Sequence, residues 1–153
     1  MLKFFTTLLL ATVLTGCATS SYYGNHLDSQ ENINQAQLAN EAVTQLSKLY
    51  PPAATRFDLK HETNDAFGIS LVKGLRENGF AVIEQLPTEN SADNAQKRPV
   101  NIVNELRYVL DTTIDNDMHL YRMSLIVNDS SITRPYLFQR GQILPAGYWV
   151  RKE

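Results

Sequence analysis

The sequence predicts an α+β fold in which two helices pack on one face of a mostly antiparallel sheet. Two observations lead to this prediction. Between residues 33 and 83, segments with apolar residues every three to four positions alternate with short strand-like runs. From residue 100 onward, apolar and polar residues alternate one by one, which is typical of strands. We therefore expect a βαβ-like start followed by a C-terminal β-meander of about four strands, with both helices covering one face.

The first predicted helix runs from Ile33 to Tyr50. Its apolar residues follow helical spacing and are expected to face inward: Ile33, Ala36, Ala39, Ala42, Val43, Leu46, Leu49 and Tyr50. Pro51 and Pro52 end this helix, because a proline disfavours the helical conformation of the residue before it. Residues 56–60 then alternate polar and apolar, which predicts a short strand with one buried face.

A second helix is predicted to begin at a capping residue, Asn64 or Asp65, and to end at Asn78-Gly79. Its expected inward residues are Phe67, Leu71, Val72 and Leu75. Glycines at 68 and 74 inside this helix each cost about 1 kcal/mol relative to alanine, so we expect close packing of the helix on the sheet.

The run 80–83 is apolar at every position, which predicts a central strand. Residues 87–99 are polar and aperiodic and are expected to form a loop. Strands are expected over 100–110, 121–127, 132–138 and 143–150, with turns at 115–117, 128–130 and 140–141. Trp149, the only tryptophan, is expected to pack on the sheet; the alternative is an exposed anchor for a partner.

The N-terminus has the pattern of an export signal. After Lys3, residues 4–14 are uncharged and mostly apolar, and this run is too short for the ~20 residues of a transmembrane helix. It leads into a four-residue motif that resembles the lipobox of bacterial lipoproteins, Leu14, Thr15, Gly16 and Cys17. We expect cleavage before Cys17 and lipidation of its thiol. The alternative is an ordinary secretory signal that contains a cysteine by chance.

Three segments follow from this interpretation: a signal peptide over 1–16, a lipidated flexible tether over 17–32, and a single periplasmic domain over 33–153. The residue directly after Cys17 is Ala18, whereas an aspartate at that position would resemble an inner-membrane retention signal. The outer membrane is therefore the expected location. Removing Lys3 from the 14 basic residues leaves 13 against 16 acidic ones, a net charge of −3. That balance argues against direct nucleic-acid binding, which needs a basic surface.

No residue pattern predicts a catalytic, cofactor or metal site. His26, His61 and His119 have no paired spacing, and solvated surface histidines are the expectation. The acidic run Asp111, Asp115 and Asp117 lacks the glycine and closing glutamate of a calcium loop, and a hairpin turn explains it better.

The glycines at 68, 74 and 79 do not form a phosphate-binding loop either. Such a loop needs glycine, lysine and then serine or threonine, whereas here Lys73 precedes Gly74 and Leu75 follows. Neither an enzyme nor a small-molecule binder is expected.

Several runs of the chain resemble the TrbH family of conjugal-transfer lipoproteins, over about residues 36–153. These runs are Lys48–Ala53, Asp65–Gly68, Leu106–Asp111, Leu120–Met123 and Pro145–Glu153. None is a catalytic signature. The resemblance implies a lipoprotein of the mating-pair-formation (conjugative type IV secretion) channel, with TrbG-like and TrbI-like channel proteins as partners. Two alternatives stay open: an unrelated lipoprotein that chaperones or plugs an outer-membrane complex, and a lipid-anchored enzyme or ligand binder.

Overall fold

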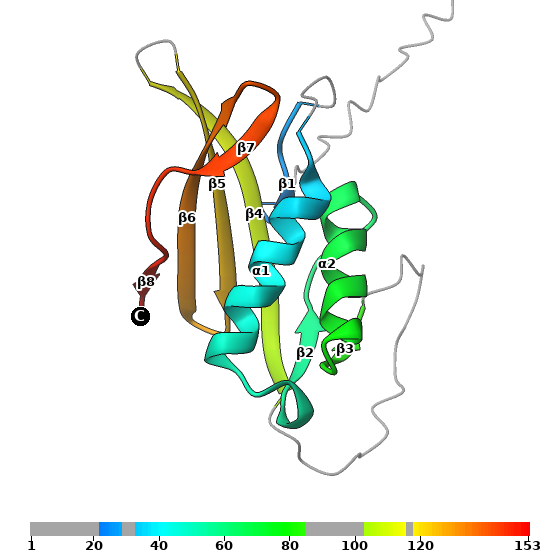
Figure 1. Ribbon diagram of the computed structural model, residues 1–153. Coiled ribbons are helices and arrows are strands. Elements are labelled where there is room, and N and C mark those ends of the chain that lie inside the picture. Colours follow the sequence, from blue (N-terminus) through cyan, green and yellow to red (C-terminus); the bar gives the residue numbers. More distant parts are fainter. Residues whose placement is uncertain (1–21, 29–32, 85–102, 116–117) are drawn as a thin grey trace, which may run out of the picture.

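The computed structural model describes residues 22–28, 33–84, 103–115 and 118–153, and the side chains of all but Asp115 among them. In this part of the chain, two helices lie side by side over one face of a single mixed sheet (Figure 1). They are α1 (Gln35–Leu49) and α2 (Ala66–Glu77). The predicted α+β class is confirmed. Neither helix has the length and hydrophobicity that a membrane-spanning helix requires.

The sheet has the strand order β3-β2-β4-β5-β6-β7, with β1 added beside β4 and β8 beside β6. The strands are β1 (Gly24–Asn25), β2 (Arg56–Leu59), β3 (Ala81–Ile83), β4 (Val103–Asp115), β5 (Met118–Val127), β6 (Ser130–Gln139), β7 (Gln142–Pro145) and β8 (Val150–Lys152). A short 3-10 turn, Pro52–Ala54, precedes β2. β2 and β3 are parallel and joined through α2, and β4 to β7 are successively antiparallel. Both the βαβ start and the meander are therefore confirmed.

Helix α1 begins where the side chain of Asn34 accepts a hydrogen bond from the backbone N–H of Gln37, at 3.0 Å. Its buried residues form one stripe: Leu38, Ala39, Ala42, Val43 and Leu46. Two residues expected to face inward are exposed. Ala36 is rotated by roughly 120° from Ala42 at 100° per residue, and Leu49 lies at the helix end.

Helix α2 is capped by Asp65, whose carboxylate accepts from the N–H groups of Phe67 and Gly68, each at 3.0 Å. All four residues predicted to face inward are buried. The chain leaves the helix at Gly79, whose φ of +87° suits glycine. The predicted close packing on the sheet holds for one of the two internal glycines.

Gly68 is the glycine that packs on the sheet side, since a Cβ there would meet the Tyr108 hydroxyl of β4 and, at 2.9 Å, the Cα of Thr63. Gly74 instead packs on the other helix. A Cβ at that position would lie 3.0 Å from a methyl group of Val43 in α1. Close packing of the two helices therefore explains the second glycine.

The predicted alternation in the meander is confirmed where the residues are described. The inward positions of β4 and β5 are all buried: Leu106, Tyr108, Leu110, Tyr121, Met123, Leu125 and Val127. The turn after β5 begins at Asn128 (φ +53°), and that after β6 uses Arg140 and Gly141 (φ +53° and +77°). Positive φ values at the first or both central residues are typical of tight hairpin turns.

The strand at the end of the βαβ unit was predicted to be central, and this prediction is wrong. In the structure it lies at the edge of the sheet. β3 has one strand partner among the described residues, β2, and its Ala81 is exposed. The run 80–83 is apolar at its start because Phe80, which precedes the strand, is buried with its ring 5.2 Å from that of Phe57. An apolar run can therefore mark the end of a helix-to-strand connection.

The predicted strand over 143–150 is two strands, β7 and β8, which pair with different parts of β6. The chain between them bends away, and two hydrogen bonds of 2.9 Å stabilise the bend. The N–H of Ala146 donates to the carbonyl of Pro135, and Nε of Arg134 donates to the carbonyl of Gly147. Trp149 lies in this bend. It is half-buried against the core, with the Arg134 guanidinium 5.9 Å from its ring.

Part of the predicted flexible tether belongs to the fold. Residues 22–28 lie along the outer edge of β4, where β1 pairs in parallel with Val109 and Leu110. The N–H of His26 continues this pairing by donating to the carbonyl of Leu110 at 2.8 Å. The signal peptide, the lipobox, loop 87–99 and Asp117 lie outside the described residues.

Candidate functional site: a tyrosine-walled groove on the open sheet face

The two faces of the sheet have different surroundings. Helices α1 and α2 cover the face that carries the buried apolar residues of β4 and β5. Within the described ranges, no second layer of helices or strands covers the other face, here called the open face. Because strand side chains alternate between faces, the residues next to each buried position lie on it.

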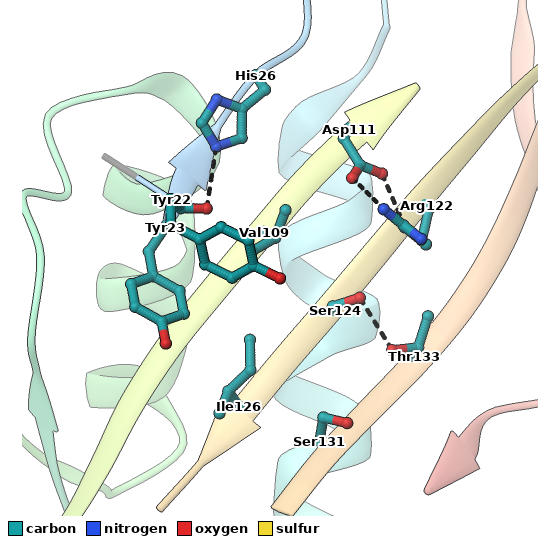
Figure 2. A pocket seen from close by; sticks show the side chains of 10 residues that line it. All are labelled: Tyr22, Tyr23, His26, Val109, Asp111, Arg122, Ser124, Ile126, Ser131 and Thr133. Atoms are coloured by element: carbon teal, nitrogen blue, oxygen red, sulfur yellow. Dashed lines mark hydrogen bonds and ion pairs between the residues drawn. The ribbon is translucent and has the colours of Figure 1, made fainter. Parts of the chain in front are cut away.

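The open face carries a groove of about 690 Å³ that crosses β4, β5 and β6 (Figure 2). Its lining is mixed in character: Tyr22, Tyr23, His26, Val109, Asp111, Arg122, Ser124, Ile126, Ser131 and Thr133. The two tyrosines precede β1 and form the wall beside β4, with their rings edge to face at 5.1 Å. The N-terminal segment therefore supplies one side of the site, and we name the site the tyrosine groove.

The polar side chains in the tyrosine groove bond mainly to one another. Arg122 donates to both carboxylate oxygens of Asp111, from Nε at 2.9 Å and from Nη2 at 2.5 Å. Hydrogen bonding to Asp111 raises the pKa of Arg122, and the nearby Tyr22 adds to the rise. The hydroxyls of Ser124 and Thr133 share a hydrogen bond of 2.9 Å across β5 and β6.

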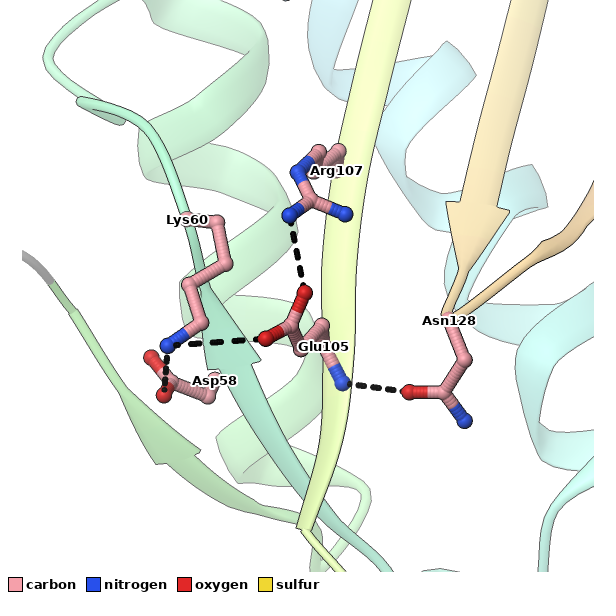
Figure 3. A network of polar contacts seen from close by, with 5 residues as sticks. All are labelled: Asp58, Lys60, Glu105, Arg107 and Asn128. Atoms are coloured by element: carbon pink, nitrogen blue, oxygen red, sulfur yellow. Dashed lines mark hydrogen bonds and ion pairs between the residues drawn. The ribbon is translucent and has the colours of Figure 1, made fainter.

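Beside the tyrosine groove, the same face carries a chain of charges on β2 and β4 (Figure 3). Lys60 Nζ lies 2.7 Å from the Asp58 carboxylate and 3.9 Å from that of Glu105, which accepts from Arg107 at 2.8 Å. The Arg107 guanidinium also lies over the ring of Tyr23, 5.2 Å from its centroid. This cation–π contact connects the charge network to the wall of the groove.

The N-terminal segment is held by a polar cluster at the start of α2. The Asp65 carboxylate that caps the helix also accepts from the Tyr108 hydroxyl and, at 3.3 Å, from Asn25 Nδ2. Asn25 Nδ2 donates as well to the side chain of Gln35 at 2.9 Å. Burial and the Asp65 carboxylate raise the pKa of Tyr108, which keeps its hydroxyl protonated as a donor. Asp65 thus joins β1, α2 and β4.

His61 does not match the expectation of a solvated histidine. It is 8% exposed, and neither ring nitrogen has a hydrogen-bond partner in the described part of the chain. Its ring packs on Tyr108 at a centroid distance of 4.3 Å. Burial lowers the pKa of His61; Arg107 adds to the fall, and Asp65 opposes it. The aromatic rings beside His61, those of Tyr108 and Tyr23, come from distant parts of the chain, so local sequence does not reveal this burial.

Of the other candidate residues, the structure brings His26 and Asp111 to the tyrosine groove and leaves His119 outside its lining. His26 is exposed at the tyrosine groove, with Nε2 3.3 Å from the Tyr22 carbonyl, and His119 is exposed in β5 rather than in a turn. Asp111 lies inside β4 and pairs with Arg122, so the hairpin turn does not account for it. The described residues contain no group of three or more histidine, cysteine or acidic side chains suited to a metal ion.

The tyrosine groove itself was not predicted as a site. The sequence shows two adjacent tyrosines, and it shows serine and threonine at the outward positions of β5 and β6. Only the strand pairing of the folded chain brings these residues together.

Comparison with protein families gives one assignment. Residues 19–153 match the model of conjugal transfer protein TrbH. No curated protein and no solved structure matches the chain closely enough to add to it. The match begins just after the expected lipidation site and includes every described residue, and the runs quoted above fall within it. The chain therefore belongs to the TrbH family of conjugal transfer proteins.

Proposed function

We propose that this protein is an outer-membrane lipoprotein of a conjugative type IV secretion channel, where it acts as an interaction module in plasmid DNA transfer. Membership of the TrbH family is the observation that carries the proposal. The open sheet face with its tyrosine groove supports an interaction role, because such a face offers a partner both apolar contacts and hydrogen bonds. In this proposal the protein binds other channel components, TrbG-like and TrbI-like, and performs no chemical step.

The proposed lipid anchor would hold the domain close to the membrane. Tyr22, the first described residue, follows Cys17 by five positions. Five residues span at most about 18 Å when fully extended. The packing of residues 22–28 on β4 therefore shortens the reach that a fully flexible tether over 17–32 would have given. Tyr22, in the wall of the tyrosine groove, would then lie within that distance of the anchored cysteine.

Gene deletion and complementation test this function. Deleting the gene from its plasmid should lower transfer, and the wild-type gene should restore it. Variants of the residues that most resemble catalytic groups, at His61, His119 or Asp117, should restore transfer as well as the wild type does. The binding role is wrong if one such variant abolishes transfer while its folding, abundance and recovery with partners stay normal.

A further inference from the structure

We infer that the tyrosine groove binds an acidic peptide segment of a partner protein. This inference rests on the proposed role as an interaction module and adds the chemistry of the partner. Three features of the groove lead to it: the hydrogen-bonding groups it leaves unused, the charges around it, and its apolar floor.

The groove leaves hydrogen-bond donors available to a ligand. Both oxygens of Asp111 accept from Arg122, so the carboxylate is already engaged. Arg122 uses Nε and Nη2 for this pair and keeps Nη1 for a ligand, and its side chain is 57% exposed. Ser124 and Thr133 share one hydrogen, which leaves the other hydroxyl hydrogen free to donate. A guanidinium beside free hydroxyls is suited to a carboxylate ligand.

The charges around the tyrosine groove also favour an anionic partner. Register places Lys152 on the same face as Ser131, and it is exposed there. With the network of Figure 3 included, this face carries four basic side chains, Lys60, Arg107, Arg122 and Lys152, against three acidic ones, Asp58, Glu105 and Asp111. Glu105 is itself bound to Arg107 at 2.8 Å. The whole chain carries a net charge of −2, so the positive excess is a local property of this surface.

The floor and wall of the groove indicate a peptide. Val109 and Ile126 form a half-buried apolar floor between the strands, and Tyr22, 79% exposed, stands beside it. A segment that places an apolar side chain on this floor and a carboxylate near Arg122 would use both parts of the site. A membrane surface presents phosphates while its acyl chains stay inside the bilayer, so it is less suited than a peptide to cover the apolar floor.

Peptide titrations of the purified full chain in detergent provide the test. The probe is a fluorescent twelve-residue peptide of alternating glutamate and leucine, compared with the same peptide carrying lysine in place of glutamate. We expect binding of the glutamate peptide that weakens about tenfold or more between low and high salt. Arg122→Gln should weaken this binding about fivefold or more.

Two further variants separate charge recognition from loss of structure. Asp111→Asn should tighten binding of the glutamate peptide several-fold, because it releases Arg122 and removes a negative charge from the site. Arg140→Gln is the control, since Arg140 is an equally cationic residue in the exposed turn after β6 and should change binding less than about twofold. Loss of folding alone would not produce opposite effects at Asp111 and Arg122.

Three outcomes would overturn the inference. They are preference for the lysine peptide, weaker binding by Asp111→Asn, and binding to phosphatidylglycerol vesicles but to neither peptide. Transfer assays report on the proposed function separately. A chain that binds the glutamate peptide yet is dispensable for transfer would refute the channel role and leave the acidic ligand standing.

Discussion

At the scale of single residues, the cluster around Asp65 determines how the N-terminal part of the fold is held. The carboxylate is the helix cap, and its remaining acceptor capacity is taken by Tyr108 and Asn25. His61 lies against this cluster without a hydrogen-bond partner of its own in the described part of the chain. A buried polar group with no partner costs stability, so His61 is a weak point that pH should reveal.

Acid should destabilise the domain partly through His61. Its pKa in the folded state is lowered, so the unfolded chain binds the proton first as pH falls below about 6.5. The contribution of this pKa difference to the free energy of unfolding is therefore complete above pH 6.5. It is lost as the pH falls to the lower pKa of the folded state. The free energy of unfolding, measured in urea at pH 7.5 and at pH 5.5, should fall less between these two pH values for His61→Phe than for the wild type. Identical losses of unfolding free energy in His61→Phe and the wild type would refute this account.

The two internal glycines of α2 should differ in their tolerance of alanine. At Gly68 a Cβ would press on backbone atoms of Thr63 and on the Tyr108 hydroxyl, so Gly68→Ala should cost about 1–3 kcal/mol. At Gly74 only the Val43 methyl group must shift, and the gain in helix propensity of about 1 kcal/mol offsets that strain. Thermal melts of both variants compare them. Equal destabilisation would show that backbone contact at Gly68 does not matter.

At the scale of elements, β1 shows how a two-residue strand can be stable enough to shape a site. Two paired residues gain little stability from backbone hydrogen bonds alone. The Asn25 side chain adds hydrogen bonds that connect β1 to the starts of both helices. The tyrosine wall depends on this strand, because Tyr22 and Tyr23 immediately precede it. Losing β1 would therefore open the groove while the helices and the meander stay packed.

Asn25→Ala should release the N-terminal segment selectively. It removes bonds to Gln35, to Asp65 and to the N–H of Leu27, each worth about 1 kcal/mol. Hydrogen exchange at the His26 N–H, which β1 pairing protects, should accelerate about tenfold or more, with a much smaller change in core amides. Asn104→Ala removes a side-chain bond at the far end of β4 and is the control. Unchanged exchange at His26 would mean that backbone pairing alone holds β1.

At the scale of the whole molecule, the proposed function requires a lipid anchor and a domain that binds partners. A lipid with two acyl chains is enough for stable membrane attachment without a transmembrane helix. A lipid on Cys17 would hold the described domain through the segment that leads to Tyr22. The segment that would carry the lipid also supplies the tyrosine wall, so in this proposal the anchor and the groove would lie close together in the chain.

Cys17→Ser should abolish lipidation and release the protein from the membrane. The thiol sulfur is the atom that would carry the lipid, and serine has no sulfur. Metabolic labelling with an acyl analogue, followed by membrane fractionation, should show no incorporation and loss of membrane retention. Thr15→Ser, a small-residue change within the lipobox, should leave both intact. Undiminished labelling of the Cys17→Ser protein would contradict the lipoprotein assignment.

The sequence by itself determined both helices, the two-residue alternation of the meander and the turns at 128–130 and 140–141. These features follow from local spacing and turn chemistry. Only the tertiary structure decided that 80–83 is an edge strand, that His61 is buried, and that residues 22–28 join the sheet. The physical reason is that strand order, burial and the tyrosine groove depend on contacts between segments about 25 to 110 residues apart, which local periodicity does not encode.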